Sequence, residues 1–279
     1  MLLSLARLVM ARTSRATPSP AGSRRPRSTA AAGWLLGALA ILGPPSAAAQ
    51  TTNASFAVLV FSKTAEFRHD SIGSGIAAIR ALGDEHGFAV DATEDANRVT
   101  GAALARYKVV VFLLTTGDIL DGAQKAALER YVRGGGGFVG IHSASDTEHH
   151  WPWYGRLVGT WFRNHPRSIQ PGMVRIEDPD HPSTKGLPRN WERVDEWYNF
   201  VGNPRGTVHV LARLDEATYS GGAMGGDHPI AWCRNVDGGR SWYTAMGHTR
   251  ESYAEPLFRR HLLGGIESAA GVAAGCPPP

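Results

Sequence analysis

The sequence predicts an α/β protein built on a doubly wound, mostly parallel sheet. Two short segments, residues 56–61 (FAVLVF) and 109–114 (VVVFLL), are continuously apolar, which is typical of parallel strands covered on both faces. Segments with helical spacing of apolar residues lie between them. Because strand and helix alternate along the first half, we expect parallel strands joined by right-handed crossovers.

The first strand, residues 56–61, is followed by a charged loop and then by a helix. Asp70 or Ser71 can cap this helix, and Gly87 can end it. Its apolar residues recur at helical spacing: Ile72, Ile76, Ile79 and Leu82. A short second strand is expected at residues 88–91.

A short helix at residues 101–106 leads to the strand at 109–114. Asp121 with Gln124 three residues later resembles a capping box, which predicts the start of a further helix. Its buried face would consist of Ala127, Leu128, Tyr131 and Val132.

Residues 134–148 are the stretch around which the chain is organised. Gly134 can end the preceding helix in a left-handed conformation, and residues 138–141 form a buried strand. The strand delivers His142 onto a sharp turn, with Asp146 just beyond it. Open α/β sheets bind ligands at such strand ends. The alternative is a structural strand followed by a solvated loop.

The second half is less regular. A short helix is expected within residues 151–160 and a closing helix at 255–267, with strands at 173–177, 208–214, 229–234 and 240–245. Seven tryptophans lie between Trp151 and Trp242. Their flat faces suit sugar rings, although each taken singly is explained as well by core packing.

The first 49 residues resemble a secretory signal peptide. They contain six arginines and no acidic residue, then an apolar run over 30–42, then Ala47-Ala48-Ala49. We expect cleavage near Ala49, no stable membrane anchor, and a periplasmic or secreted protein. An amino-terminal anchor is the alternative, and Arg24-Arg25 leaves the choice between Sec and twin-arginine export open. Residues 50–270 would form one domain and 271–279 a disordered tail.

Removal of the leader changes the net charge. The whole chain has a formal charge of +4, but the part from Gln50 carries 23 basic and 25 acidic residues. No nucleic-acid partner is therefore expected. The two cysteines, Cys233 and Cys276, are too few for a disulfide scaffold or a cysteine zinc site, and whether they pair is open.

Polar groups that carry chemistry follow strands or lie in adjoining loops. The segments are Arg68-His69-Asp70, His142-Ser143 with Asp146, Asp195-Glu196-Trp197-Tyr198, and Gly247-His248-Thr249. Loops after parallel strands converge on one edge, so His69 and His142 should lie on the same side. His69, His142 and His248 are candidate ligands of a divalent metal such as zinc, and Glu196 completes the set. The same groups without metal could serve as general acid and base. No nucleotide cofactor is expected.

A thiol mechanism is excluded. In the class I glutamine amidotransferase fold a cysteine stands at the strand-to-helix elbow, whereas this elbow reads Gly140-Ile141-His142-Ser143-Ala144. Ser143 is not set in a G-x-S-x-G motif.

Several segments together resemble the ThuA-like family, named for trehalose utilisation. They are Lys63-Thr64, Phe67-Arg68-His69, residues 136–144, Asp146-Thr147, Trp151-Pro152-Trp153-Tyr154, residues 195–200 (DEWYNF), residues 228–232 (HPIAW), Gly247-His248 and Glu251-Ser252-Tyr253. The resemblance implies a flavodoxin-like, class I glutamine amidotransferase-like fold without the cysteine. It also implies a link to catabolism of disaccharides, including glycosides oxidised to 3-keto sugars. Where some members carry histidines after the third strand, residues 115–118 read Thr-Thr-Gly-Asp.

Our first hypothesis is an exported hydrolase or lyase that cleaves or rearranges an oxidised glycoside. His69 and His142 would position a metal or polarise the carbonyl, Glu196 would act as base or ligand, and His248 as ligand or acid. Substrate contacts are expected from Lys63, Arg68, Asp146, Trp197, Tyr198 and His228. The alternative is a non-catalytic sugar-binding or scaffolding protein that works beside an oxidoreductase. The oligomeric state is open.

Overall fold

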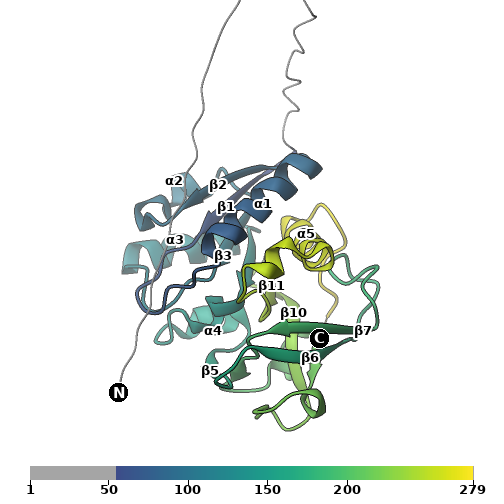
Figure 1. The fold of residues 1–279 in the computed structure, drawn as a ribbon. Helices are drawn as coiled ribbons and strands as arrows, with labels where there is room; N and C mark the ends of the chain where they lie inside the picture. The colour runs from purple at the N-terminus through teal and green to yellow at the C-terminus, as the bar shows by residue number, and fades with distance from the viewer. Residues whose placement is uncertain (1–54, 279) are drawn as a thin grey trace, which may run out of the picture. The chain divides into compact units, whose positions relative to one another are not determined.

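The computed structural model describes residues 55–278, so the predicted leader at residues 1–49 lies outside the described part. A nine-stranded sheet forms the centre, in the order β2-β1-β3-β4-β11-β10-β9-β6-β7 (Figure 1). Its parallel part consists of β1 (Ala57–Phe61), β2 (Ala89–Thr93), β3 (Val109–Leu113), β4 (Gly137–Ile141) and β11 (Gly239–Thr244). Its antiparallel extension consists of β10 (His228–Val236), β9 (His209–Asp215), β6 (Gln170–Ile176) and β7 (Asn190–Asp195). The predicted fold class is confirmed.

Helices cover both faces of the sheet. The helix α1 (Ile72–His86) packs beside α5 (Pro256–Ala270), whereas α2 (Gly101–Leu104) packs against α3 (Gly122–Arg133) (Figure 1). The short helix α4 (Pro152–Val158) contacts β11. A small second sheet pairs β5 (Phe162–Asn164) with β8 (Asn199–Phe200). None of the helices described is long and apolar enough to cross a membrane.

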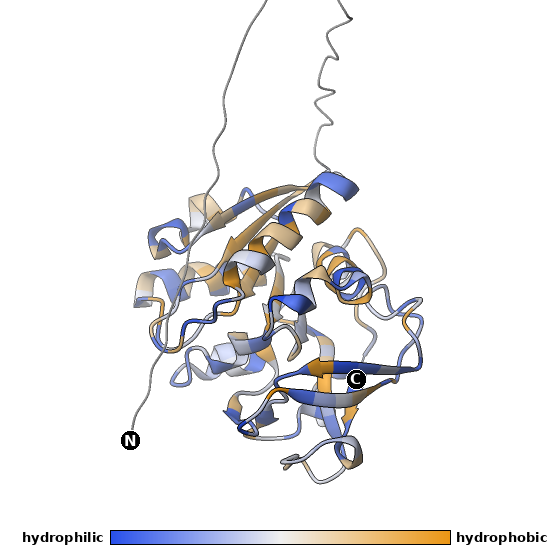
Figure 2. Cartoon of the chain, viewed as in Figure 1, coloured by the Kyte–Doolittle hydropathy of each residue, from blue (hydrophilic) through white to orange (hydrophobic). Residues whose placement is uncertain are grey.

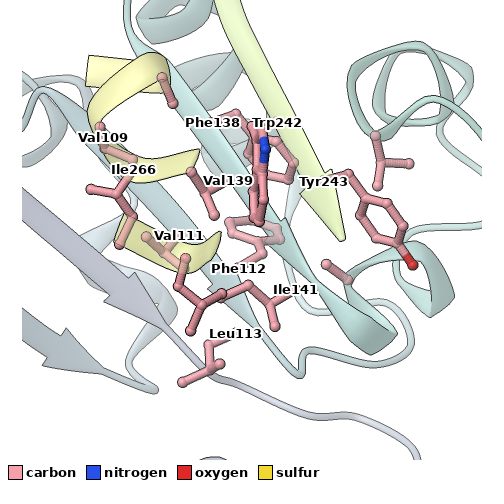
Figure 3. Packing of buried hydrophobic residues seen from close by; sticks show 14 of the residues in the cluster. Val109, Val111, Phe112, Leu113, Phe138, Val139, Ile141, Trp242, Tyr243 and Ile266 are labelled. Carbon is pink, nitrogen blue, oxygen red and sulfur yellow. The ribbon is translucent and has the colours of Figure 1, made fainter. Parts of the chain in front are cut away.

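The core lies between these layers. Phe112, Phe138 and Ile141 pack beside Trp242 of β11 and Ile266 of α5 (Figure 3). Figure 2 shows that apolar residues gather in the strands of the parallel part, whereas polar residues are frequent on β6 and β7. The strand β7 reads NWERVD, with alternating exposed and buried residues. Three of its residues are charged, so its sequence pattern did not predict a strand, and none was expected here.

Two local predictions are wrong. Gly134 has a φ of −77°, and the left-handed residue is Gly135, with a φ of 92°. The side chain of Ser71 does not cap α1; it donates a hydrogen bond to the backbone oxygen of His248 at 2.7 Å. The capping box of Asp121 and Gln124 is confirmed.

A disulfide joins Cys233 of β10 to Cys276, which answers the question that the sequence left open. Cys276 belongs to the segment predicted as a disordered tail. Its backbone oxygen also accepts a hydrogen bond from the Asn235 amide at 3.1 Å. The segment after α5 is therefore tied to the sheet.

Loss of this disulfide should lower the stability of the domain. The bond spans 43 residues, and closing a loop of this length in the unfolded chain is worth up to about 4 kcal/mol. Urea unfolding of the wild type and of Cys276→Ser, each with and without reductant, measures the effect. Reductant should destabilise only the wild type, and equal midpoints in all four experiments would contradict the prediction.

A buried pair of histidines, His181 and His261, joins α5 to the loop after β6. Nδ1 of His261 donates to the backbone oxygen of Ser183 at 2.8 Å, and Nε2 of His181 lies 3.1 Å from Oγ of Ser268. Burial lowers the pKa of His261 to about 3 and that of His181 to about 4. Both rings are therefore neutral in the folded protein at neutral pH.

Stability should consequently fall in acid. Below a pH of about 6.5 the unfolded chain protonates these histidines while the folded chain does not, so protons favour unfolding. Their contribution is fully present above this pH and is lost as the pH falls toward 4. Unfolding free energies measured from pH 7.5 to 4 should decline less steeply in His261→Asn than in the wild type. Parallel pH profiles would show that His261 is not responsible.

Candidate metal centre

Four side chains meet at the carboxyl ends of the strands: His69, His142, Glu196 and His248. Each offers a ligand atom, and these atoms all lie within 4.8 Å of one another. His69 follows β1, His142 follows β4, Glu196 follows β7 and His248 follows β11. The expectation that His69 and His142 share one side of the molecule is confirmed.

His142 stands at the elbow after β4 with a left-handed backbone, φ 52°. This conformation is uncommon for a residue with a Cβ. Its Nδ1 donates a hydrogen bond to the backbone oxygen of Ala245 at 2.7 Å, which fixes the tautomer. Nε2 consequently presents its lone pair to His248 and Glu196. The ring of Tyr198 packs against His142 with centroids 4.1 Å apart.

Three of the ligand atoms form a nearly equilateral triangle. Nε2 of His142 lies 3.2 Å from Nδ1 of His248 and 3.4 Å from Oε2 of Glu196, and the latter two atoms are 3.1 Å apart. Ligand atoms around a tetrahedral zinc, with bonds of about 2.0–2.1 Å, are separated by about 3.3 Å. The triangle therefore has the edge length that such an ion requires.

The charges in the triangle favour a bound cation or a shared proton. Nε2 of His142 and Oε2 of Glu196 are both acceptors, and two acceptors this close repel each other unless a proton or a metal ion lies between them. Burial alone would raise the pKa of Glu196, but the neighbouring imidazoles of His142 and His248 hold it well below its ordinary value. Burial alone would lower the pKa of His248, but Glu196 raises it overall. Glu196 is therefore ionised and can bind a cation.

His69 completes the cluster from the other side. Its ring lies 4.9 Å from that of His142 and 5.0 Å from that of His248. Burial, and then the charge that His142 and His248 can carry, lowers the pKa of His69 to about 2. Nδ1 of His69 is 3.4 Å from Oγ of Ser143, and one nitrogen of this ring is a ligand atom of the cluster. A neutral imidazole is the form that binds metal ions.

The buried carboxylate of Asp195 holds two of these ligands in place. It accepts hydrogen bonds from the backbone N–H groups of Glu196 at 3.0 Å, Gly247 at 2.9 Å and His248 at 3.0 Å. Gly247 has a φ of 111°, which favours glycine. The guanidinium of Arg193 pairs with Asp195 at 3.2 Å. Asp195 thus ties the loop after β7 to the loop after β11.

A cleft of about 550 Å³ opens beside the cluster, and His69 and His248 are part of its lining. Phe67, Arg68 and Ile169 also line it. Arg68, a predicted substrate contact, pairs with Glu94 at 2.6 Å, and both side chains are exposed. This cleft therefore borders two of the candidate ligands, His69 and His248.

Of the other predicted substrate contacts, Tyr198 packs against His142, and the remaining four bond to other parts of the chain. Lys63 donates to the backbone oxygen of Ile119 at 3.0 Å, and Asp146 contacts His149 at 2.8 Å. Trp197 is buried, and its indole donates to the backbone oxygen of Gln170. His228 is also buried and donates from Nε2 to the backbone oxygen of Tyr198 at 2.7 Å. Trp197 and His228 therefore support the loop that carries Glu196.

Sequence reasoning missed His165. This exposed histidine follows β5, and its Nδ1 lies 3.3 Å from Oε1 of Glu196. Its position directly after a strand was the available signal, but β5 is three residues long and was not predicted. Residues 115–118 stand where some family members carry histidines. One of them, Thr116, has a structural role, because its Oγ1 donates to the backbone oxygen of Phe67 at 2.8 Å.

The fold is an α/β fold with a mixed, mostly parallel sheet and flanking helices, and a histidine stands at the elbow after β4. The sequence matches the family described as ThuA, trehalose utilisation, over residues 57–269, and the chain belongs to this family. None of the curated proteins compared with the sequence matches it.

Solved structures agree with this assignment. A ThuA-like protein from Bacteroides uniformis is 26% identical, with a TM-score of 0.67 over 81% of this chain and 96% of that one. A second, from Parabacteroides merdae, is 19% identical, with a TM-score of 0.65 over 80% of this chain and 92% of that one. A β-galactosidase from Bacillus circulans is 16% identical, with a TM-score of 0.50 over 79% of this chain and 31% of that one, which shows the fold alone.

Replacement of Asp195 by Asn should destabilise the loops of the cluster. An amide nitrogen would face backbone N–H donors, and Arg193 would lose its buried partner, at a cost of about 2–4 kcal/mol. Urea unfolding gives the total cost, and hydrogen exchange at Gly247 and His248 localises it. Asp84→Asn, on the exposed side of α1, is the matched control. Unchanged exchange at both amides would contradict this account of Asp195.

Proposed function

We propose that the chain is an exported enzyme of carbohydrate metabolism that cleaves or rearranges 3-keto glycosides with a metal-assisted histidine and glutamate site. The observation that carries the proposal is the triangle of His142, His248 and Glu196, with His69 beside it. The description of the family as trehalose utilisation supports a glycoside substrate.

The cluster fits a divalent ion such as zinc. The donor set of three imidazoles and one carboxylate suits zinc and its first-row neighbours. His69, His142 and His248 would hold the ion together with Oε2 of Glu196. When bound, the ion supplies a Lewis acid that polarises a carbonyl oxygen.

A ketone at C3 of the sugar makes the proton on C2 acidic. Removal of this proton by a base forms a C=C bond as the C1–O bond breaks, and the departing oxygen takes up a proton. The elimination alone is the reaction of a lyase. If water then adds across the new C=C bond, the net reaction is that of a hydrolase. It does not need the paired carboxylates of ordinary glycosidases.

The residues around the triangle divide these roles. Because Glu196 is held ionised by two histidines, it suits the role of ligand better than that of base. His165 is exposed and adjacent to Oε1 of Glu196, and we assign it as the base. Tyr198 packs on His142 and keeps that ring in position.

Export is supported by two features. The leader-like composition of residues 1–49 precedes the part that matches the family. The disulfide between Cys233 and Cys276 is of the kind that persists in oxidising compartments. Amino-terminal sequencing of the exported protein should give a start near Gln50.

Removal of a ligand should abolish both metal binding and turnover. His142→Asn is the suitable variant, because asparagine tolerates the left-handed backbone at this elbow. Its metal affinity should fall by at least about a hundredfold. Elemental analysis and turnover of a 3-keto glucoside measure the two effects, and His86→Ala, an exposed histidine of α1, is the control.

The outcomes separate the candidate functions. If the wild type is fully active without bound metal, the proposal of a metal-assisted site is wrong. The histidines would then act as general acid and base. A wild type that binds the sugar without forming product, with or without added metal, would instead favour the non-catalytic sugar-binding protein.

A further inference from the structure

Phe67 is exposed beside the cluster. Its side chain is 64% exposed, and Ile169 is 46% exposed; both line the cleft that leads to His69 and His248. Large apolar side chains scattered singly over a surface need no explanation. Two of them in one polar-walled cleft, beside a group of candidate ligands, indicate a binding surface.

The loop that carries Phe67 is fixed to the sheet. Ala65 donates from its backbone N–H to the oxygen of Thr116 at 2.8 Å, and Oγ1 of Thr116 donates to the backbone oxygen of Phe67 at 2.8 Å. Thr116 is itself buried. The fixed loop therefore keeps the phenyl ring of Phe67 in the cleft. The apolar surface of this ring faces water there.

The ring also lies directly against the cluster. The centroids of Phe67 and His69 are 4.8 Å apart, and the ring planes meet at 83°. The surrounding wall is polar: Arg250 pairs with Asp70 at 3.0 Å, and Oγ1 of Thr249 lies 3.0 Å from Oγ of Ser252. The cleft thus combines an aromatic face with groups that can hydrogen-bond hydroxyls.

We propose that Phe67 is the stacking platform of a sugar subsite, which packs the C–H face of one pyranose ring and directs its oxygens toward His69 and His248. A pyranose has an apolar C–H face and a rim of hydroxyls, which matches an aromatic face within a polar wall. The cleft, at about 550 Å³, lies in the range of small-molecule sites. The inference rests on the proposed function and assigns the position of its substrate.

Calorimetry on the full exported chain tests the subsite. Trehalose and 3-keto-trehalose are the probes, and the proteins are the wild type, Phe67→Ala and Phe67→Trp, with the bound metal of each measured in parallel. Phe67→Ala should weaken binding by about tenfold or more, because one buried aromatic contact is lost. Phe67→Trp should retain binding, and bound metal should be the same in all three.

Val272→Ala is the control for loss of an exposed apolar side chain outside the cleft, and it should bind as the wild type does. Equal affinity of Phe67→Ala and the wild type would overturn the subsite while the proposed function stood. Failure of the wild type to bind either sugar would overturn both. If Phe67→Ala changed only the oligomeric state, the exposed face would be an interface between copies, and the subsite would be wrong.

Discussion

The cluster depends on one buried carboxylate, that of Asp195. Two candidate ligands, Glu196 and His248, come from loops more than fifty residues apart, and Asp195 binds the backbone of both. A charged acceptor without water around it needs such donors, and the loops need an acceptor for their N–H groups. The carboxylate of Asp195 accepts from the N–H groups of both loops, so each group has the partner it needs. The two loops can therefore take only a narrow range of relative positions. The triangle of ligand atoms follows from this constraint.

The elbow after β4 shows how one backbone geometry can serve a different chemistry. A left-handed residue at the end of a parallel strand projects its side chain over the edge of the sheet, which suits a nucleophile. At this position His142 donates from Nδ1 to Ala245, and it has Glu196 and His248 as neighbours. These surroundings suit a ligand. The fold therefore supplies a direction for the side chain, and the neighbouring residues determine what that side chain can do.

The sequence predicted the parallel part and the histidines well, but not the contacts that support them. Apolar strands such as 109–114 and the capping box at Asp121 are local signals, and His69 and His142 follow such strands directly. By contrast, β7 alternates charged and buried residues, and β5 is short, so neither gave a pattern. Trp197 and His228 are predicted substrate contacts, and both are buried, with His228 bonded to the backbone of Tyr198. Only long-range packing decides between these roles, because the residue types suit both.

The antiparallel extension of the sheet supplies the carboxylate of the cluster, whereas the parallel part supplies only imidazoles. His69, His142 and His248 follow parallel strands, so three imidazoles converge by topology alone. These three carry no negative charge, and burial disfavours a cation among them. Glu196, after β7 at the far edge of the extension, brings the carboxylate that offsets this charge. His165, after β5 of the small second sheet, lies 3.3 Å from Glu196, and its ring stacks with that of Tyr198. The continuation of the sheet past β11 thus adds a negative charge to three neutral ligands, which favours a bound cation.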